Sequence, residues 1–314
     1  MNKAPADLKT PVASLLLGLA AGDAPGVPWE FRPRGSFHGE GMSGYGTHNH
    51  PPGTWPDDTS LTLCLADSLS RGFSPEDIAQ NFIRWRDEAA FTARGAVFDI
   101  GISTAKAISC LKSGAAPEQA GCAGVNENGN GSLMRIAPLV FYLNGKPDEE
   151  RFHLTKTVSA ITRDHPWSAA ACFIYLEYLR KPASGTDKSA AYTELRRDFQ
   201  EGSPRISRDT LDKFSRILRT DISALPESDI KSGGFVIDTQ EAALWRFLTA
   251  ENCRTAVLKA VNLGDDTDTA AAVTGALAGL AYGVEGIPPD WLDALAAAGD
   301  IRRLAGAMAG TLAA

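Results

Sequence analysis

The sequence has no hydrophobic run close to the ~18 to 20 residues that a membrane span needs. Alternating patterns typical of β-strands are nearly absent as well. The basic excess that general nucleic-acid binding requires is also missing, since 31 Lys and Arg face 38 Asp and Glu, for a net charge of −7. We therefore expect a helical globular protein whose partners include neither nucleic acid nor a membrane.

Cysteine is scarce too, with five residues in 314, an odd number scattered along the chain. These cysteines lie mostly in apolar helical patterns, which is typical of reduced core thiols rather than a disulfide framework or a zinc site. The first ten residues are polar, and the apolar run Val12–Ala21 lacks the basic flank of a signal peptide. We therefore expect a cytoplasmic protein.

Helical apolar spacing dominates what remains, so the sequence predicts an all-α protein of about ten or more helices. Nine segments carry this pattern most clearly: Ser14–Asp23, Thr59–Ser70, Pro75–Arg86, Gly101–Lys112, Thr155–Ile161, Trp167–Arg180, Thr239–Leu248, Cys253–Leu263 and Asp268–Tyr282. Residues 1–314 are expected to form one domain with an N-terminal arm over 1–11. The polar, Ser-rich segment 181–232 predicts a peripheral insertion with short helices over 190–199 and 207–218.

Small residues recur every four positions in an early and a late helical segment. Gly18 and Gly22 form such a pair near the start, and Ala271, Gly275 and Gly279 form a longer stripe near the end. Residues four apart share one helix face, and small residues there let another backbone approach closely. We therefore expect these two helices to pack together and to join the two ends of the chain.

Two acidic loops immediately precede predicted helices. One carries Asp57 and Asp58, and the other carries Asp266 and Asp268. Asp is a favoured N-cap residue, so either loop alone is explained by helix capping. Together they hold more acids than caps can use, and these would repel one another without cations between them. Oxygen ligands of this kind suit Mg²⁺ or Mn²⁺, and a pair of such ions can hold vicinal hydroxyls.

Six motifs in one order resemble the ADP-ribosylglycohydrolase family, which includes hydrolases of ADP-ribosylarginine. The motifs are GLAAGDAPGVPWE from Gly18, WPDDT from Trp55, FDIG from Phe98, GNGSLMR from Gly129, GGFVIDT from Gly233 and NLGDDTDT from Asn262. The resemblance spans about residues 12 to 290 without the insertion. It implies a compact orthogonal helical bundle that removes ADP-ribose from modified proteins.

The resemblance also implies roles for individual residues. Two Mg²⁺ ions, or Mn²⁺, would be held by Asp57, Asp58, Asp266, Asp268 and Thr269. Glu30 matches a carboxylate that activates water, and Asp99 matches a second acid/base of the bacterial arginine-specific members. The substrate-binding positions are a loop around the diphosphate and distal ribose, a histidine near the diphosphate and an aromatic at the adenine end: Gly129, Asn130, Gly131, Ser132, Met134, Arg135, His165 and Phe235.

Several of these residues also have ordinary structural explanations. Asp99 can equally cap the helix that starts near Gly101, and His165 and Phe235 would otherwise be read as cap or core residues. Three histidines lie close together in a Gly- and Pro-rich stretch, which we interpret as a mobile loop rather than a metal site: His38, His48 and His50.

Two positions depart from the family pattern. Pro56 stands where a Thr or Ser hydroxyl usually binds metal, so a water would have to replace it, or the Thr59 hydroxyl would have to reach in. Asp265 replaces the second glycine of a Gly-Gly pair, and we expect its side chain to face solvent at the helix N-terminus. The Pro56 departure predicts weaker binding of one ion.

We therefore expect a metal-dependent hydrolase that reverses mono-ADP-ribosylation, with arginine favoured because the FDIG element at Phe98 resembles the arginine-specific branch. Two other functions stay open. The protein could bind ADP-ribose without turnover, or it could act as an immunity protein that neutralises an ADP-ribosyltransferase toxin by hydrolysis or docking. For docking, the arm and the insertion are the candidate surfaces.

Overall fold

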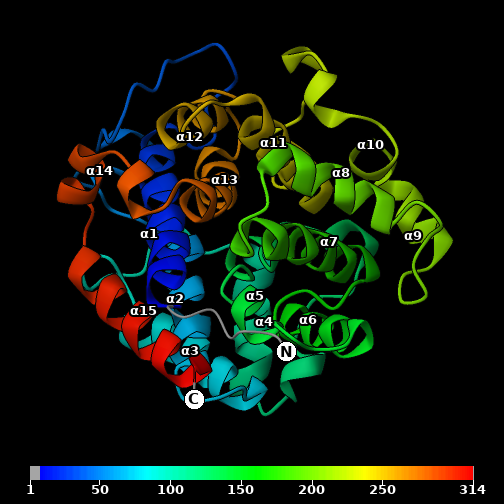
Figure 1. Cartoon of the computed structure of the whole chain (residues 1–314). Coiled ribbons are helices and arrows are strands. Elements are labelled where there is room, and N and C mark those ends of the chain that lie inside the picture. The colour runs from blue at the N-terminus through cyan, green and yellow to red at the C-terminus, as the bar shows by residue number, and fades with distance from the viewer. Residues whose placement is uncertain (1–7, 314) are drawn as a thin grey trace.

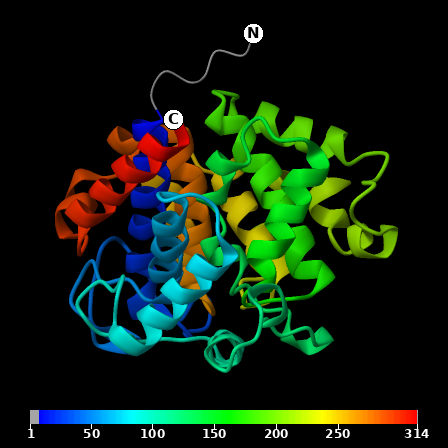
Figure 2. The same cartoon turned by 90° about the horizontal axis from the view of Figure 1, so that it is seen from below.

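The centre of the molecule is a pair of helices from opposite ends of the chain, α1 (Lys9–Gly26) and α13 (Thr267–Tyr282). Figures 1 and 2 show them side by side in both views. A Cβ built on Gly18 would lie 2.5 Å from the Gly275 carbonyl oxygen, and one built on Gly275 would lie 2.2 Å from that of Gly18. The backbones are therefore in direct contact, and the predicted packing of the two small-residue stripes is confirmed.

The computed structural model describes residues 8–313, and within that range it contains helices and isolated bridges but no strand. The predicted all-α class is confirmed. The remaining helices are α2 (Asp57–Leu69), α3 (Pro75–Glu88), α4 (Ile102–Lys112), α5 (Leu139–Tyr142), α6 (Asp148–Ala160), α7 (Pro166–Ala183), α8 (Lys188–Asp198), α9 (Arg208–Lys213), α10 (Ser215–Leu218), α11 (Val236–Thr249), α12 (Cys253–Val261), α14 (Pro289–Ala294) and α15 (Ala298–Ala313). None of the helices in the described range is long and apolar enough to cross a bilayer.

All nine predicted helices are present, but several bounds differ. Helix α1 begins at Lys9, so the last part of the expected arm is helical, and residues 1–7 lie outside the described range. Helix α15 was not predicted, although Ile301, Ala305 and Met308 are spaced to share one face and all three are buried. That spacing could have predicted the helix from the sequence.

The segment 181–232 begins inside α7 and contains α8, α9 and α10, which lie along one edge of the molecule (Figure 1). Its large apolar side chains are buried or half-buried. Tyr192, Leu195, Phe214 and Ile217 are buried and belong to the same continuous core as α1 and α13. The segment therefore packs as an integral part of the described fold.

The contact between α1 and α13 fixes where their ends lie. At the C-terminal end of α1, a Cβ on Gly26 would lie 2.3 Å from the Asp268 Cα, and the Thr267 hydroxyl donates to the Gly26 carbonyl oxygen at 2.8 Å. The acidic first turn of α13 is thereby held against the last turns of α1. The first turn of α2 meets the same place, since Thr269 bonds to Asp58.

Candidate active site

Three buried carboxylates meet where α1, α2 and α13 converge. Asp23, Asp58 and Asp268 are each at most 1% exposed, and they offer one oxygen apiece within 4.8 Å of one another. Burial is the main cause that raises the pKa of all three, and the neighbouring carboxylates raise them further. Each has one buried oxygen with no hydrogen-bond partner among the described residues. Unpaired buried anionic oxygens in such proximity fit a divalent cation.

The other predicted ligands surround this cluster. Asp266 directly precedes α13 without a side-chain cap bond, and with Glu30 and Asp268 it forms a second group whose oxygens lie within 4.8 Å of one another. The Thr269 hydroxyl donates to Asp58 at 3.3 Å, and Asp57 accepts from the Gly101 N–H at 3.5 Å. The structure thus brings the acids of both loops together, as the sequence predicted.

The hydroxyl of Thr59, one of the two expected replacements for the ligand missing at Pro56, is not free in this structure. It donates to Asp23 at 2.5 Å, and the Thr59 N–H donates to the same carboxylate oxygen at 3.0 Å. The Thr59 ligand stays a prediction beside the water, because a hydroxyl that donates its proton keeps oxygen lone pairs for a cation. Asp23, which the sequence analysis did not single out, is the residue that Thr59 orients toward the cluster.

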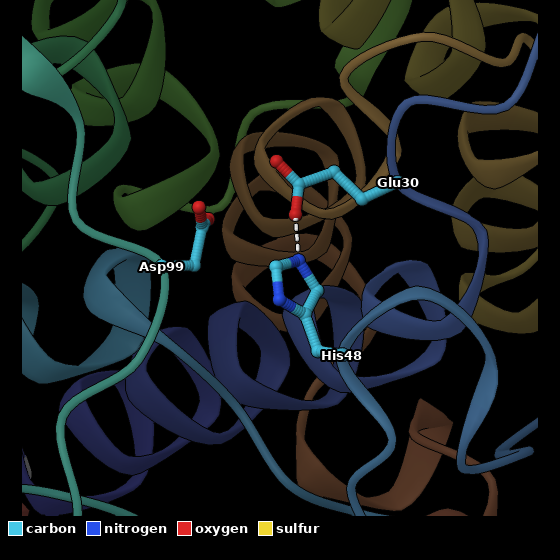
Figure 3. Close-up of side chains that lie close together, drawn as sticks. All are labelled: Glu30, His48 and Asp99. Atoms are coloured by element: carbon cyan, nitrogen blue, oxygen red, sulfur yellow. Dashed lines mark hydrogen bonds and ion pairs between the residues drawn. The ribbon is translucent and has the colours of Figure 1, made fainter.

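Glu30, His48 and Asp99 form a second constellation beside the carboxylate cluster (Figure 3). The Glu30 carboxylate and the His48 Nε2 share a short hydrogen bond, and the three side chains offer donor atoms within 4.8 Å of one another. Burial raises the pKa of Glu30 to about 7, although the bond to His48 opposes the rise. The bond to Glu30 raises the pKa of His48, and burial raises that of Asp99.

The position of His48 corrects our interpretation of it. We expected it in a mobile loop without a partner in the site, but its ring lies against Glu30, and it sits 5.5 Å from the Phe98 ring, centroid to centroid. His50 packs on the same Phe98 ring at 3.9 Å. Glu30 can exchange a proton near neutral pH, and Asp99 provides a second carboxyl group nearby. Acid–base catalysis requires two such groups.

These groups open into a cavity of about 430 Å³. Both loops of acids, the catalytic candidates and the glycine loops contribute to its wall, which is formed by Glu30, Phe31, Asp57, Asp99, Gly101, Thr104, Asn130, Gly131, Met134, Arg163, Gly233, Gly234, Asp265, Asp266 and Thr269. The volume is within the range of a small-molecule site. Asp265 is solvent-exposed, as expected, but it also borders this cavity.

The loop that starts at Gly129 is joined to the carboxylate cluster through Asn130. The Asn130 side-chain amide donates to Asp266 at 2.6 Å and to the Thr239 hydroxyl at 2.9 Å, while its backbone N–H donates to the Gly234 carbonyl oxygen at 3.0 Å. Gly131 and Met134 line the cavity next to it. The two predicted glycine-containing loops therefore form one wall.

Ser132 and Arg135 point away from this wall. Both are fully buried, and the Arg135 guanidinium donates to the Val158 carbonyl oxygen at 3.0 Å and lies 4.7 Å from the centre of the Phe82 ring. The Ser132 hydroxyl lies 3.0 Å from that of Ser159. Both side chains therefore anchor the loop in the core, and neither lines the cavity.

The histidine and the aromatic residue expected around the substrate lie outside the cavity wall. His165 caps α7 by accepting from the Trp167 N–H at 3.2 Å, and it borders a separate hollow of about 440 Å³ with Phe152 and Lys156. Phe235 is 37% exposed and meets the Trp167 ring edge to face. The antiparallel bridge between Phe235 and Gly129 keeps this aromatic beside the glycine loop.

Arg163 is a site residue that the sequence analysis missed. It is 5% exposed, and it is the only basic side chain among the described residues of the cavity wall. A Cβ on Gly131 would lie 2.6 Å from its guanidinium, so the glycine makes room for the arginine. Its Nε has no partner among the described residues. A buried cation behind a glycine loop suits a phosphate.

Comparison with known proteins shows which protein family this chain resembles. A model of the family described as ADP-ribosylglycohydrolase matches residues 4–313. The chain is 34% identical to the ADP-ribosylarginine hydrolase of Pseudomonas putida, over 92% of this chain and 75% of the relative. It is 29% identical to the ADP-ribosyl-dinitrogen reductase glycohydrolase of Rhodospirillum rubrum, over 89% of this chain and 88% of the relative. A solved structure called an ADP-ribosylglycohydrolase-related protein complex superposes with a TM-score of 0.82 at 32% identity, over 97% of this chain and 99% of the other.

Proposed function

The chain belongs to the ADP-ribosylglycohydrolase family, and from that premise we propose that it hydrolyses the N-glycosidic bond between ADP-ribose and arginine side chains of modified proteins. Membership makes it a hydrolase that acts on ADP-ribose. The arginine acceptor is supported by two relatives at 34% and 35% identity, from Pseudomonas putida and Serratia proteamaculans, which carry the name ADP-ribosylarginine hydrolase. The observation that carries the proposal is that Glu30, Asp99 and acids from both loops line one cavity, beside the buried carboxylate cluster.

We propose that the carboxylate cluster holds two divalent ions, Mg²⁺ or Mn²⁺. The donor set fits, because it is made only of carboxylates and a hydroxyl, and because Asp23, Asp58 and Asp268 keep unpaired buried oxygens. Asp57, Asp266 and Thr269 complete the set. When bound, the ions supply positive charge that binds the hydroxyls of the reacting ribose and stabilises charge in the transition state.

Glu30 and Asp99 divide the proton transfers. With a pKa of about 7, Glu30 is partly ionised at neutral pH and accepts a proton from the attacking water. His48 holds the Glu30 carboxylate in place through their hydrogen bond. Asp99, whose pKa burial raises, donates a proton to the departing guanidine as the bond to the anomeric carbon breaks. The products are the unmodified arginine side chain and ADP-ribose.

The opposite wall binds the remainder of ADP-ribose. Backbone N–H groups around Gly131 and the buried Arg163 guanidinium face the space where the diphosphate would lie. Phe235, which is bridged to Gly129, offers an exposed ring for the adenine. Binding at these remote groups fixes the anomeric carbon next to Glu30.

The proposal is tested by measuring ADP-ribose release from arginine-, serine- and acid-linked substrates with Mg²⁺, with Mn²⁺ and with a chelator. We expect release from arginine that the chelator abolishes. Binding of ADP-ribose without release from any linkage would instead make the chain a binder. If a variant without turnover, such as Asp58→Asn, still blocked an ADP-ribosyltransferase, the docking alternative would stand.

A further inference from the structure

Phe31 and Asp265 lie next to each other in the wall of the cavity, and both have unusual backbone conformations. Phe31 has a φ of +64° and is 67% exposed. Asp265 has a φ of +62° and is also exposed. This left-handed region disfavours residues other than glycine, asparagine and aspartate. An exposed aromatic ring in this conformation gains nothing from the core, so the fold holds it there at a cost.

The two residues are fixed to each other by their backbones. The Phe31 N–H donates to the Asp265 carbonyl oxygen at 2.7 Å, and the Asp265 N–H donates to the Arg32 carbonyl oxygen at 2.8 Å. The Arg34 guanidinium donates to the Leu263 carbonyl oxygen at 2.9 Å and ties the same two segments together. The ring and the carboxylate are thereby carried on one rigid rim.

The rim lies on the leaving-group side of the site. Phe31 directly follows Glu30, and its ring centroid is 6.2 Å from that of His48, the partner of Glu30. Asp265 directly precedes Asp266, which belongs to the carboxylate cluster. The glycine loop with Asn130 and the Arg163 guanidinium lies on the wall assigned to the diphosphate, so the departing group must leave along the rim.

We propose that Phe31 and Asp265 form the subsite that recognises the guanidinium of the arginine acceptor. This inference rests on the function proposed above and adds how the acceptor is selected. A planar guanidinium stacks on an aromatic face and pairs with a carboxylate, so an exposed ring and an acid on one rim match both of its binding modes. A neutral serine hydroxyl would gain little from either group.

The experiment compares the KM of Phe31→Leu, Asp265→Asn and wild type for a peptide ADP-ribosylated on arginine. Calorimetry gives the Kd of each protein for free ADP-ribose. Leu keeps an apolar side chain without the ring, and Asn tolerates the same φ without the charge. We expect each variant to raise KM by about two- to fivefold, since an exposed cation–π contact or ion pair contributes up to about 1 kcal/mol. The Kd for free ADP-ribose should stay unchanged.

Matched controls come from outside the cavity wall. Tyr45 is also an exposed aromatic at positive φ, and Glu285 is an acid at the far end of α13. Tyr45→Leu and Glu285→Gln should leave KM as in wild type, and thermal unfolding of all four variants should match.

Three results would overturn the inference. An unchanged KM in both Phe31→Leu and Asp265→Asn shows that the rim does not bind the acceptor. An equal loss of affinity for free ADP-ribose shows that the rim binds ADP-ribose itself. If wild type releases no ADP-ribose from arginine, the proposed function fails first and the inference falls with it.

Discussion

The contact between α1 and α13 makes Gly275→Ala the sharpest test of how the fold builds the site. The added Cβ would lie 2.2 Å from the Gly18 carbonyl oxygen and 2.9 Å from the Gly22 Cα, whereas ordinary contact begins near 3.4 Å. All of these neighbours are backbone atoms, so no side chain can move aside. The helices themselves must separate, by more than 1 Å at this point.

The expected magnitude follows from two opposing effects. Overpacking a core costs typically about 1 to 3 kcal/mol, and a rigid backbone contact belongs at the upper end. Replacing a helical glycine with alanine returns up to about 1 kcal/mol of helix propensity. We therefore expect Gly275→Ala to lower the free energy of unfolding by about 2 kcal/mol. Separating α1 from α13 should also weaken Mg²⁺ binding, since Asp23 and Asp268 lie on different helices.

Gly310→Ala in α15 is the matched control, because a Cβ there meets nothing within 4 Å. It should raise the free energy of unfolding by up to about 1 kcal/mol. Guanidinium denaturation gives both free energies, and Mg²⁺ titration by calorimetry gives the second readout. Equal midpoints and equal Mg²⁺ affinities for the two variants would refute the reasoning, because the backbone contact would then not constrain the helices.

Further predictions concern the carboxylates. The double variant Asp57→Asn with Asp58→Asn should abolish ADP-ribose release while its circular dichroism spectrum stays that of the wild type. Normal turnover of this variant with metal present would show that the two residues only cap a helix. Glu30→Gln should lower kcat by orders of magnitude while ADP-ribose still binds, since the amide cannot accept a proton. Asp99→Asn should reduce turnover more on arginine-linked than on ester-linked substrate, because guanidine leaves as a base; the reverse order would exchange the two roles. Burial raises the pKa of Glu30 from 4.5 to about 7, so the folded protein holds a proton that the unfolded chain has already released. The contribution of this proton to the free energy of unfolding is therefore full below pH 4.5 and is lost as pH rises through 7. The melting temperature in chelator should therefore fall from about pH 5 to pH 8, and Mg²⁺ should raise it more at pH 8 than at pH 6, since metal ligands must be deprotonated; a flat profile in chelator would contradict the pKa direction.

The features that the sequence predicted well are those written in local patterns. Apolar spacing located nine helices, and small residues four apart identified the contact between Gly18 and Gly275. The acidic loops were predicted to meet because they flank those helices. In each case a short stretch of chain carries the whole signal.

The features that the sequence analysis missed depend on contacts between distant segments. Asp23 lies within an apolar helix, and only its bonds from Thr59 show that it faces the carboxylates; a lone acid in such a run was the available signal. The partner of His48 comes from a tertiary contact in a segment without regular structure. Arg135 belongs to the glycine loop, whereas Arg163 follows α6, and nothing local shows that Arg163 is the one that lines the cavity.

The pairing of α1 with α13 also determines when the site can form during synthesis. The bond between Thr267 and Gly26 joins residues 241 positions apart. At about 5 to 20 residues per second, α1 leaves the ribosome on the order of tens of seconds before its partner exists. Throughout that interval its glycine face and Asp23 have no α13 to pack against. The proposed cation site therefore forms only after α13 is made, and we expect a nascent chain that stalls before residue 267 to lack it.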